Sequence, residues 1–174
     1  MKGLLLAAGF GTRFAPYTDK IPKPCIPLLN VPIAFYNLHV LQQARLDELT
    51  VNTHHLPSQV EELFSKTAAI DIPVHFSHEE GDILGTGGAI LAARPSLEGR
   101  GTFIVGNADV VNGFNIRDVL TFHHKNRGMA TLVVMQHPEA GKKYGAVWVD
   151  KKHHVVGIGK TKPDVECKPY HYVG

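Results

Sequence analysis

The chain has 174 residues, of which 44% are hydrophobic and 20% are charged, and this composition is typical of a globular protein rather than a disordered one. Eighteen lysine and arginine residues against sixteen acidic ones give a formal charge of +2, which is too balanced to indicate a nucleic-acid partner or an anionic membrane surface. The N-terminus has neither the apolar length of a spanning helix nor a signal-peptide pattern. The two cysteines cannot build a disulfide framework, so we expect a single domain in a reducing cytoplasm.

The pattern of apolar residues predicts strands that alternate with helices. Strands are expected at residues 2–8, 48–53, 73–77, 102–105 and 129–136, and helices at 33–44, 58–68, 86–93 and 116–126. The five prolines of the segment 9–32 exclude a helix or a central strand there, and loops of this length often carry function. This alternation indicates an α/β domain with a largely parallel sheet. A later hairpin at 145–158 suggests either a mixed sheet or a small appended β element.

The segment 6–13 (Leu-Ala-Ala-Gly-Phe-Gly-Thr-Arg) is a glycine loop directly after the first strand. Such a loop lets backbone N–H groups approach a phosphate or a base beyond the carboxyl end of a sheet. Phe14 stands where the dinucleotide fingerprint needs a glycine, and Asn52 stands where it needs an acidic residue, so a dinucleotide-dependent oxidoreductase is disfavoured. The phosphate loop of NTPases is also absent. Taken alone, the two glycines favour a structural turn.

Two cations in the same loop favour a binding role. Arg13 offers a planar fork for phosphate oxygens, and Lys23 a compact charge whose backbone is stiffened by Pro22 and Pro24. A stiffened lysine loses less ordering entropy when it binds a ligand. The alternative is an exposed loop with two ordinary cations.

Further polar residues follow the other predicted strands. Asp109 comes after the fourth strand and could bind Mg²⁺ together with substrate phosphates, although a loop aspartate or a helix N-cap explains it equally well. The glycine-rich segment 79–88 could place a helix N-terminus against a ligand, or it could be a flexible turn. Asn52 and His54 reach the same edge, where such residues more often cap a strand. The adjacent histidine pairs make poor chelates, so we assign them to structure or surface.

Together, the segment 6–13, Pro-Lys-Pro at 22–24 and the segments 85–88 and 107–109 resemble the signature of sugar-1-phosphate nucleotidyltransferases, and the resemblance covers nearly the whole chain. It implies a Rossmann-like three-layer α/β/α nucleotide-diphospho-sugar transferase fold with a mixed central sheet and a late β-hairpin. It also implies an enzyme that joins an NTP to a sugar-1-phosphate, giving an NDP-sugar and pyrophosphate, with no nucleic-acid or membrane partner. Short bacterial members acting on N-acetylmuramate-1-phosphate or mannose-1-phosphate are similar, which implies a cytoplasmic role in making cell-envelope sugar nucleotides.

The resemblance also implies roles for individual residues. Three would be catalytic: Arg13 holding the pyrophosphate leaving group, Lys23 bridging the phosphates, and Asp109 binding the cofactor Mg²⁺. The remaining positions would bind the nucleotide or the sugar phosphate, namely Ala8, Gly9, Gly11, Thr12, Gly85, Thr86, Gly88, Asn107 and Lys162.

The chain departs from the family pattern at three points. Ala108 replaces a glycine before the metal aspartate, and Thr161 replaces the glutamate of a Glu-Lys-Pro segment. The family's second metal-binding aspartate lies beyond the equivalent of residue 174. We therefore expect one nucleotidyltransferase domain over residues 1–174 that lacks the family's C-terminal segment. The alternative is a nucleotide- or sugar-nucleotide-binding module without catalytic activity.

Overall fold

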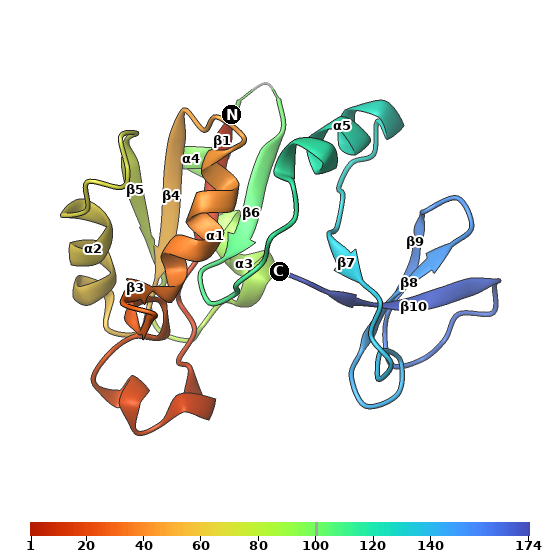
Figure 1. Cartoon of the computed structure of the whole chain (residues 1–174), viewed down its shortest axis with the longest axis horizontal. Coiled ribbons are helices and arrows are strands. Elements are labelled where there is room, and N and C mark those ends of the chain that lie inside the picture. Colours follow the sequence, from red (N-terminus) through yellow and green to blue (C-terminus); the bar gives the residue numbers. More distant parts are fainter. Residues whose placement is uncertain (100) are drawn as a thin grey trace. The chain divides into compact units, whose positions relative to one another are not determined.

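The computed structural model describes residues 1–99 and 101–174, which divide into two compact units, Met1–Arg117 and Asp118–Gly174 (Figure 1). Each unit has its own four-stranded β-sheet. None of the helices in these described ranges has the length and apolar character needed to cross a lipid bilayer. The single nucleotidyltransferase domain expected over residues 1–174 stays a prediction.

A parallel sheet forms the centre of the first unit. Its strands lie in the order β5-β4-β1-β6, and they are β1 (Lys2–Leu6), β4 (Glu48–Thr53), β5 (Val74–His78) and β6 (Phe103–Asn107). Leu5 of β1 stands opposite Val51 of β4 on one side and Gly106 of β6 on the other. The sequence predicts all four strands to within about two residues.

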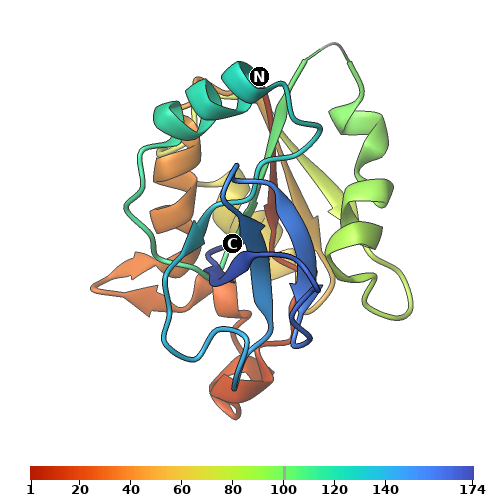
Figure 2. The same cartoon turned by 90° about the vertical axis from the view of Figure 1, so that its right-hand side faces the viewer.

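Helices cover both faces of this sheet. α1 (Ile33–Gln42) and α2 (Pro57–Ser65) pack on one face, and α3 (Gly85–Ala92) and α4 (Arg94–Leu97) pack on the other (Figure 2). Leu5 lies in the core beneath α1 and α2, whereas Leu4 packs with Ala93 and Leu97 on the opposite face. Successive side chains of a strand point to opposite faces, so a strand covered on both sides needs an unbroken apolar run. The predicted three-layer α/β/α arrangement is confirmed.

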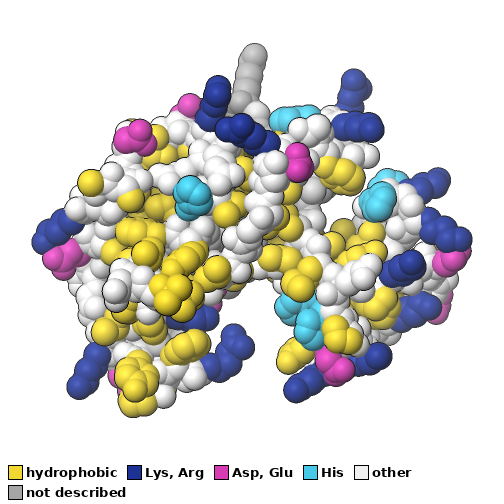
Figure 3. All heavy atoms as spheres, viewed as in Figure 1, with side chains coloured by type: hydrophobic (Ala, Val, Ile, Leu, Met, Phe, Trp, Pro, Cys, Tyr) yellow, Lys and Arg dark blue, Asp and Glu magenta, His cyan; other side chains and the backbone are white. Residues whose placement is uncertain are grey.

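The proline-rich segment 9–32 contains neither an α-helix nor a strand of the parallel sheet, as its prolines predict. It forms three 3₁₀ helices and a two-stranded hairpin, namely η1 (Thr12–Phe14), η2 (Tyr17–Asp19), η3 (Lys23–Cys25), β2 (Pro27–Leu28) and β3 (Val31–Pro32). Several of its large apolar side chains are exposed, Tyr17 by 74% and Leu29 by 87%. Figure 3 shows apolar side chains gathered over this part of the first unit.

The second unit is built on an antiparallel sheet in the order β7-β10-β8-β9. Its strands are β7 (Val134–Met135), β8 (Ala146–Asp150), β9 (Val155–Gly159) and β10 (Cys167–Tyr172). The boundary between the two units falls within helix α5 (Ile116–Asn126). Trp148 of β8 is buried against Ala140 and Ala146, and its Nε1–H donates to the carbonyl oxygen of Gly159 at 3.1 Å. This bond ties β8 to β9, the hairpin that the sequence predicts.

Two details of the predicted architecture are corrected. The central sheet is not mixed, because its four strands are all parallel and the late hairpin belongs to a separate sheet. The strand expected over residues 129–136 shrinks to Val134–Met135, since only these two residues pair with β10, and Met129 is fully exposed.

Candidate functional site

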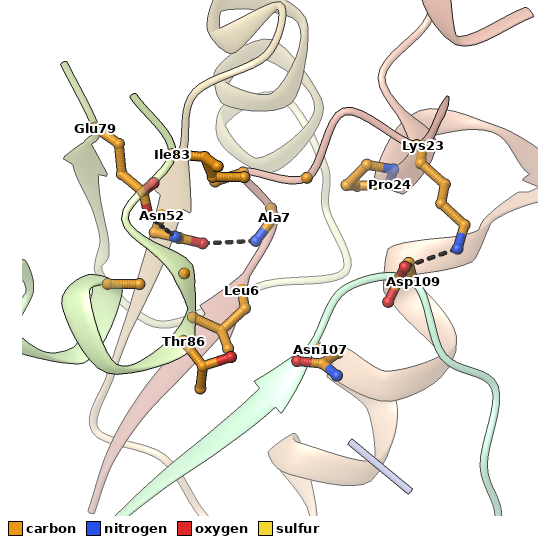
Figure 4. Close-up of a pocket in the computed structure, with 15 residues that line it drawn as sticks. Leu6, Ala7, Lys23, Pro24, Asn52, Glu79, Ile83, Thr86, Asn107 and Asp109 are labelled. Carbon is orange, nitrogen blue, oxygen red and sulfur yellow. Dashed lines mark hydrogen bonds and ion pairs between the residues drawn. The ribbon is translucent and has the colours of Figure 1, made fainter. Parts of the chain in front are cut away.

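The carboxyl ends of β1, β4 and β6 meet at one edge of the parallel sheet. From β1 the chain crosses to β4 on one side, and it later returns to β6 on the other. In open α/β sheets, ligands bind outside the carboxyl ends of the strands where the strand order reverses in this way. A cavity of about 250 Å³ lies at this edge, and every residue that lines it belongs to the first unit (Figure 4).

The glycine loop after β1 forms one wall of the cavity. Gly11 has a φ of +64°, and a Cβ atom at this position would lie 2.9 Å from Thr18 Cγ2 and 3.1 Å from Lys23 Cβ. The left-handed backbone and the lack of space both require glycine here. At Gly9, by contrast, a Cβ atom would meet nothing within 4 Å. The shape of the loop therefore depends on Gly11 more than on Gly9.

Lys23 and Asp109 form an ion pair at the cavity. The Nζ atom of Lys23 donates to Asp109 Oδ2 at 2.7 Å, and the two side chains are 15% and 38% exposed (Figure 4). Lys23 opens η3, in which Pro24 is buried. Asp109 follows Ala108, whose N–H donates to the carbonyl oxygen of Leu6 at 2.9 Å and so extends the pairing of β6 with β1. The structure thus joins two side chains that the sequence assigns to phosphate and metal binding.

A buried polar chain connects the glycine loop to the second glycine-rich segment. Asn52, at the end of β4, accepts from the N–H of Ala7 at 2.6 Å and donates to Glu79 Oε1 at 2.6 Å (Figure 4). Glu79 Oε2 in turn accepts from the N–H of Leu84 at 2.8 Å. Asn52 is 2% exposed and Glu79 is 3% exposed. Because buried polar groups cost free energy unless they are paired, these bonds hold the two glycine segments at a set separation.

Asn37 of α1 fixes the end of β6. Its Nδ2 donates to the carbonyl oxygen of Asn107 at 2.8 Å, and its Oδ1 accepts from Asn112 Nδ2 at 3.1 Å. Gly106 makes room for it, since a Cβ atom there would lie 2.9 Å from Asn37 Nδ2. Asn37 is 1% exposed, so its hydrogen bonds hold the backbone that leads into Asp109.

Eight of the predicted site residues line the cavity, and they are Ala8, Gly9, Gly11, Lys23, Gly85, Thr86, Asn107 and Asp109. Thr12 and Arg13 lie exposed in η1 and are not part of the lining. Gly88 lies within α3, also outside the lining. Lys162 is exposed in the β9–β10 loop of the second unit. The chemical roles assigned to all twelve residues stay predictions.

Sequence reasoning missed the supporting residues Asn37, Asn52 and Glu79. Asn52 stood out as a polar residue at the predicted sheet edge, but its expected role was only to cap a strand. In the structure it joins three segments of the site. The available signal was a polar residue near the end of one predicted strand, Asn52, and a carboxylate just after the next strand, Glu79. Asn37 carried no such signal, because it lies within a helix.

The donor chemistry fits a divalent cation that binds together with a phosphate ligand. Asp109 and Asn107 supply oxygen donors, and Mg²⁺ is commonly held by one or two carboxylates plus substrate phosphates. Over residues 1–99 and 101–174, no group of three or more histidine, cysteine, aspartate or glutamate side chains could hold a metal ion. The described residues therefore fit a substrate-borne cation rather than one enclosed by protein ligands alone.

The fold and the position of the cavity agree with the comparison with known families. Residues 2–172 match the family described as nucleotidyl transferase. The chain belongs to this family. Membership confirms the resemblance to sugar-1-phosphate nucleotidyltransferases on which the residue roles rest.

Named relatives of this nucleotidyltransferase family member share about a third of its residues. Mannose-1-phosphate guanylyltransferase 1 of Arabidopsis thaliana is 32% identical over 177 residues, which cover 100% of the chain and 47% of the relative. UTP–glucose-1-phosphate uridylyltransferase of Synechocystis sp. is 31% identical over 178 residues, which cover 95% of the chain and 45% of the relative. The chain thus spans about half the length of the curated relatives it matches.

Two solved structures share the fold of this chain. A UDP-glucose pyrophosphorylase complexed with UDP-glucose superposes with a TM-score of 0.79 at 20% identity, covering 99% of this chain and 74% of that one. HddC from Yersinia pseudotuberculosis, complexed with GMP-PN, superposes with a TM-score of 0.75 at 20% identity, covering 99% and 73%. At these identities the likeness shows the α/β fold alone.

Proposed function

We propose that the cavity at the carboxyl ends of β1 and β6 binds a nucleoside triphosphate, whose nucleotidyl group is transferred to a sugar-1-phosphate to give an NDP-sugar and pyrophosphate. The observation that carries this proposal is the Lys23–Asp109 ion pair beside the glycine loop, in a chain of the nucleotidyl transferase family. The names of the relatives support the substrate class, since they include a guanylyltransferase for mannose-1-phosphate and a uridylyltransferase for glucose-1-phosphate.

The proposed reaction is an in-line displacement at the α-phosphorus. A phosphate oxygen of the sugar-1-phosphate attacks this atom and forms a new P–O bond. The bond to the oxygen that bridges the α- and β-phosphates breaks, and its electron pair leaves with pyrophosphate. The second pKa of a phosphate monoester is about 6, so the attacking oxygen is already ionised near pH 7 and no general base is needed. Catalysis then depends on positioning and on offsetting negative charge.

The lining residues suit these two tasks. Gly9 and Gly11 carry no side chain that would keep a phosphate away from the backbone. Lys23 can exchange its carboxylate partner for a phosphate oxygen, because its three donors rotate on a flexible stem. Arg13 lies in the same loop and would bind the leaving pyrophosphate. Asp109 would hold Mg²⁺, which when bound offsets charge on the phosphate oxygens.

Pyrophosphate release tests the proposal. The chain is incubated with Mg²⁺ and each of GTP, UTP, dTTP and CTP, in combination with mannose-1-phosphate, glucose-1-phosphate or N-acetylmuramate-1-phosphate. We expect pyrophosphate from at least one pair. Lys23→Met and Asp109→Asn should each lower the turnover by about a hundredfold or more, since each removes charge stabilisation at the reacting phosphates.

A matched control lies directly after α2, at its C-cap residue Lys66. Lys66 pairs with Glu62 at 2.6 Å, and both side chains are exposed. Lys66→Gln therefore removes a lysine from an ion pair far less buried than that of Lys23, and it should leave the turnover unchanged. Wild-type turnover in Lys23→Met or Asp109→Asn would contradict the assigned roles. NTP binding without pyrophosphate from any pair would instead establish the binding module that lacks catalytic activity.

A further inference from the structure

His55 lies just beyond β4 and is not part of the cavity lining, yet it contacts the loop that forms one cavity wall. Its Nε2 atom lies 2.6 Å from the carbonyl oxygen of Thr18. A carbonyl oxygen only accepts hydrogen bonds, so Nε2 of His55 carries the hydrogen and donates it. Thr18 is 2% exposed within η2, a buried position in a segment whose other residues are mostly exposed. The bond therefore ties the proline-rich loop to the central sheet at a protected point.

Thr18, which His55 holds in place, also contacts the backbone of Gly11. The hydroxyl of Thr18 donates to the carbonyl oxygen of Gly11 at 3.1 Å. The Cγ2 atom of Thr18 also fills the space beside the Gly11 backbone, where a Cβ atom would lie 2.9 Å from it. Gly11 lines the cavity. A continuous path thus runs from the end of β4 through His55 and Thr18 to the backbone of the glycine loop.

The aromatic ring of Phe10 adds a second contact to the same path. Its centroid lies 5.2 Å from the ring of His54, edge on, and 5.6 Å from the ring of His55. The Nδ1 atom of His54 lies 2.9 Å from the carbonyl oxygen of Glu79, so this ring is anchored at the end of β5. The two histidines therefore hold both Phe10 and Thr18, which flank Gly11 on either side in the sequence.

Side chains also tie the later part of this loop to the rest of the unit, since Gln59 Nε2 donates to the carbonyl oxygen of Lys20 at 2.9 Å and Lys23 pairs with Asp109, whereas His55 reaches the part next to Gly11 through Thr18. In the described part of the chain, the backbone hydrogen bonds between residues 11 and 26 are local, such as those from the N–H of Phe14 to the carbonyl oxygen of Gly11 and from the N–H of Cys25 to that of Pro22. A segment held by short local turns keeps its internal shape, but it needs side-chain contacts to fix its position against the cavity.

We propose that His55 is a positioning residue for nucleotide binding: through Thr18 it holds the glycine loop in its binding shape before the nucleotide arrives. This inference rests on the proposed function of the cavity. A loop that is already ordered loses less conformational entropy when a ligand binds, and the gain appears as affinity for the triphosphate. His55 does not touch the ligand, so its effect falls on binding and leaves the chemical step largely unchanged.

The test compares three variants by titration calorimetry with GTP and, in parallel, with UTP. His55→Phe keeps a ring beside Phe10 but cannot donate, and it should weaken NTP binding about tenfold through the lost hydrogen bond. His55→Gln restores an N–H donor near the Nε2 position and should bind within about threefold of the wild type. Thr18→Val keeps the shape of Thr18 without its donor, and it should also weaken binding, which keeps the test open if His55→Phe fails to fold.

Gln42→Leu is the matched control. Gln42 of α1 is half-buried, and its Nε2 donates to the carbonyl oxygen of Ala69 at 2.8 Å in a solvent-exposed hydrogen bond. Its loss should leave NTP affinity unchanged. In steady state, His55→Phe should raise KM for the NTP with little change in kcat.

Three results would overturn the inference while leaving the proposed function intact. The first is a folded His55→Phe variant that binds the NTP as tightly as the wild type. The second is an equal loss of NTP affinity in His55→Phe and His55→Gln. The third is a lower kcat in His55→Phe with an unchanged KM for the NTP. A wild-type chain that binds neither GTP nor UTP nor any other NTP contradicts the proposed function itself.

Discussion

Replacing Lys23 by glutamine should raise the affinity of the protein for a divalent cation when no nucleotide is bound. The Nζ atom of Lys23 lies 2.7 Å from Asp109 Oδ2, so lysine and a cation compete for the same carboxylate. In the presence of a triphosphate this competition is relieved, because Lys23 gains phosphate oxygens as partners. The structure therefore predicts that the nucleotide and the metal strengthen each other's binding.

The size of the effect follows from the burial of the pair. Exposed ion pairs contribute about 0–1 kcal/mol, whereas hydrogen bonds to charged groups contribute about 1.5–3 kcal/mol. Lys23 is 15% exposed and Asp109 is 38% exposed, which places this pair between the two classes, at about 1–2 kcal/mol. Since 1.4 kcal/mol corresponds to a factor of ten, Lys23→Gln should bind the cation about 5- to 30-fold more tightly.

Mn²⁺ binding followed by electron paramagnetic resonance measures this directly. Wild type, Lys23→Gln and Asp109→Asn are titrated without nucleotide, with Lys66→Gln as the control for loss of a lysine. Asp109→Asn should weaken Mn²⁺ binding both in the wild type and when combined with Lys23→Gln. If Asp109→Asn abolishes Mn²⁺ binding while Lys23→Gln matches the wild type, the competition does not exist. If Asp109→Asn binds Mn²⁺ like the wild type, Asp109 is not the metal ligand.

Three further predictions concern stability and reactivity. In thermal unfolding, Gly11→Ala should lower the free energy of unfolding by about 1–3 kcal/mol, because the residue has φ +64° and a Cβ atom would lie 2.9 Å from Thr18 Cγ2. Gly9→Ala is the control and should change the free energy of unfolding by no more than about 0.5 kcal/mol, since a Cβ atom there would meet nothing within 4 Å. Asn52→Leu should cost about 2–4 kcal/mol in urea unfolding, since it leaves buried groups at both of its ends unpaired, and a loss below 1 kcal/mol would contradict the buried chain. Burial raises the pKa of the Cys25 thiol to about 11. A Cys167→Ser variant leaves Cys25 as the thiol that reacts, and at pH 8 its reaction with iodoacetamide should be roughly a hundredfold slower in the folded protein than in denaturant. The reaction rate of the folded protein should keep rising up to about pH 11.

The sequence predicts the parallel sheet well because the required pattern is local. A strand covered on both faces reads as a nearly unbroken apolar run, and residues 3–6 show this without knowledge of their neighbours, whereas residues 48–53 show the alternation of apolar Leu49 and Val51 with polar residues. The strand expected at 129–136 failed for the opposite reason. Its apolar residues suit a strand, but pairing depends on β10, which meets only Val134 and Met135. Strand propensity is local, whereas the extent of pairing is a property of the partner.

The candidate site was predictable to the level of the sheet edge but not to the level of contacts. Glycines and polar residues after successive strands place Gly11 and Asp109 at one edge by topology alone. The ion pair between Lys23 and Asp109 joins residues 86 positions apart, and no local pattern specifies it. The same holds for Asn52, whose two hydrogen bonds reach 45 and 27 positions along the chain. Long-range side-chain partners follow from packing, which a single sequence does not reveal.

Transfer of the α-phosphate is the most direct measure of the central claim that this chain supports nucleotidyl transfer at the cavity. The chain is incubated with Mg²⁺, a sugar-1-phosphate and an NTP labelled with ³²P at either the α or the γ position. We expect α-label in an NDP-sugar and γ-label in pyrophosphate, with both products formed about a hundredfold or more slowly by Lys23→Met and at the wild-type rate by Lys66→Gln. Release of γ-label as inorganic phosphate, or α-label transfer that survives Lys23→Met unchanged, would contradict that claim.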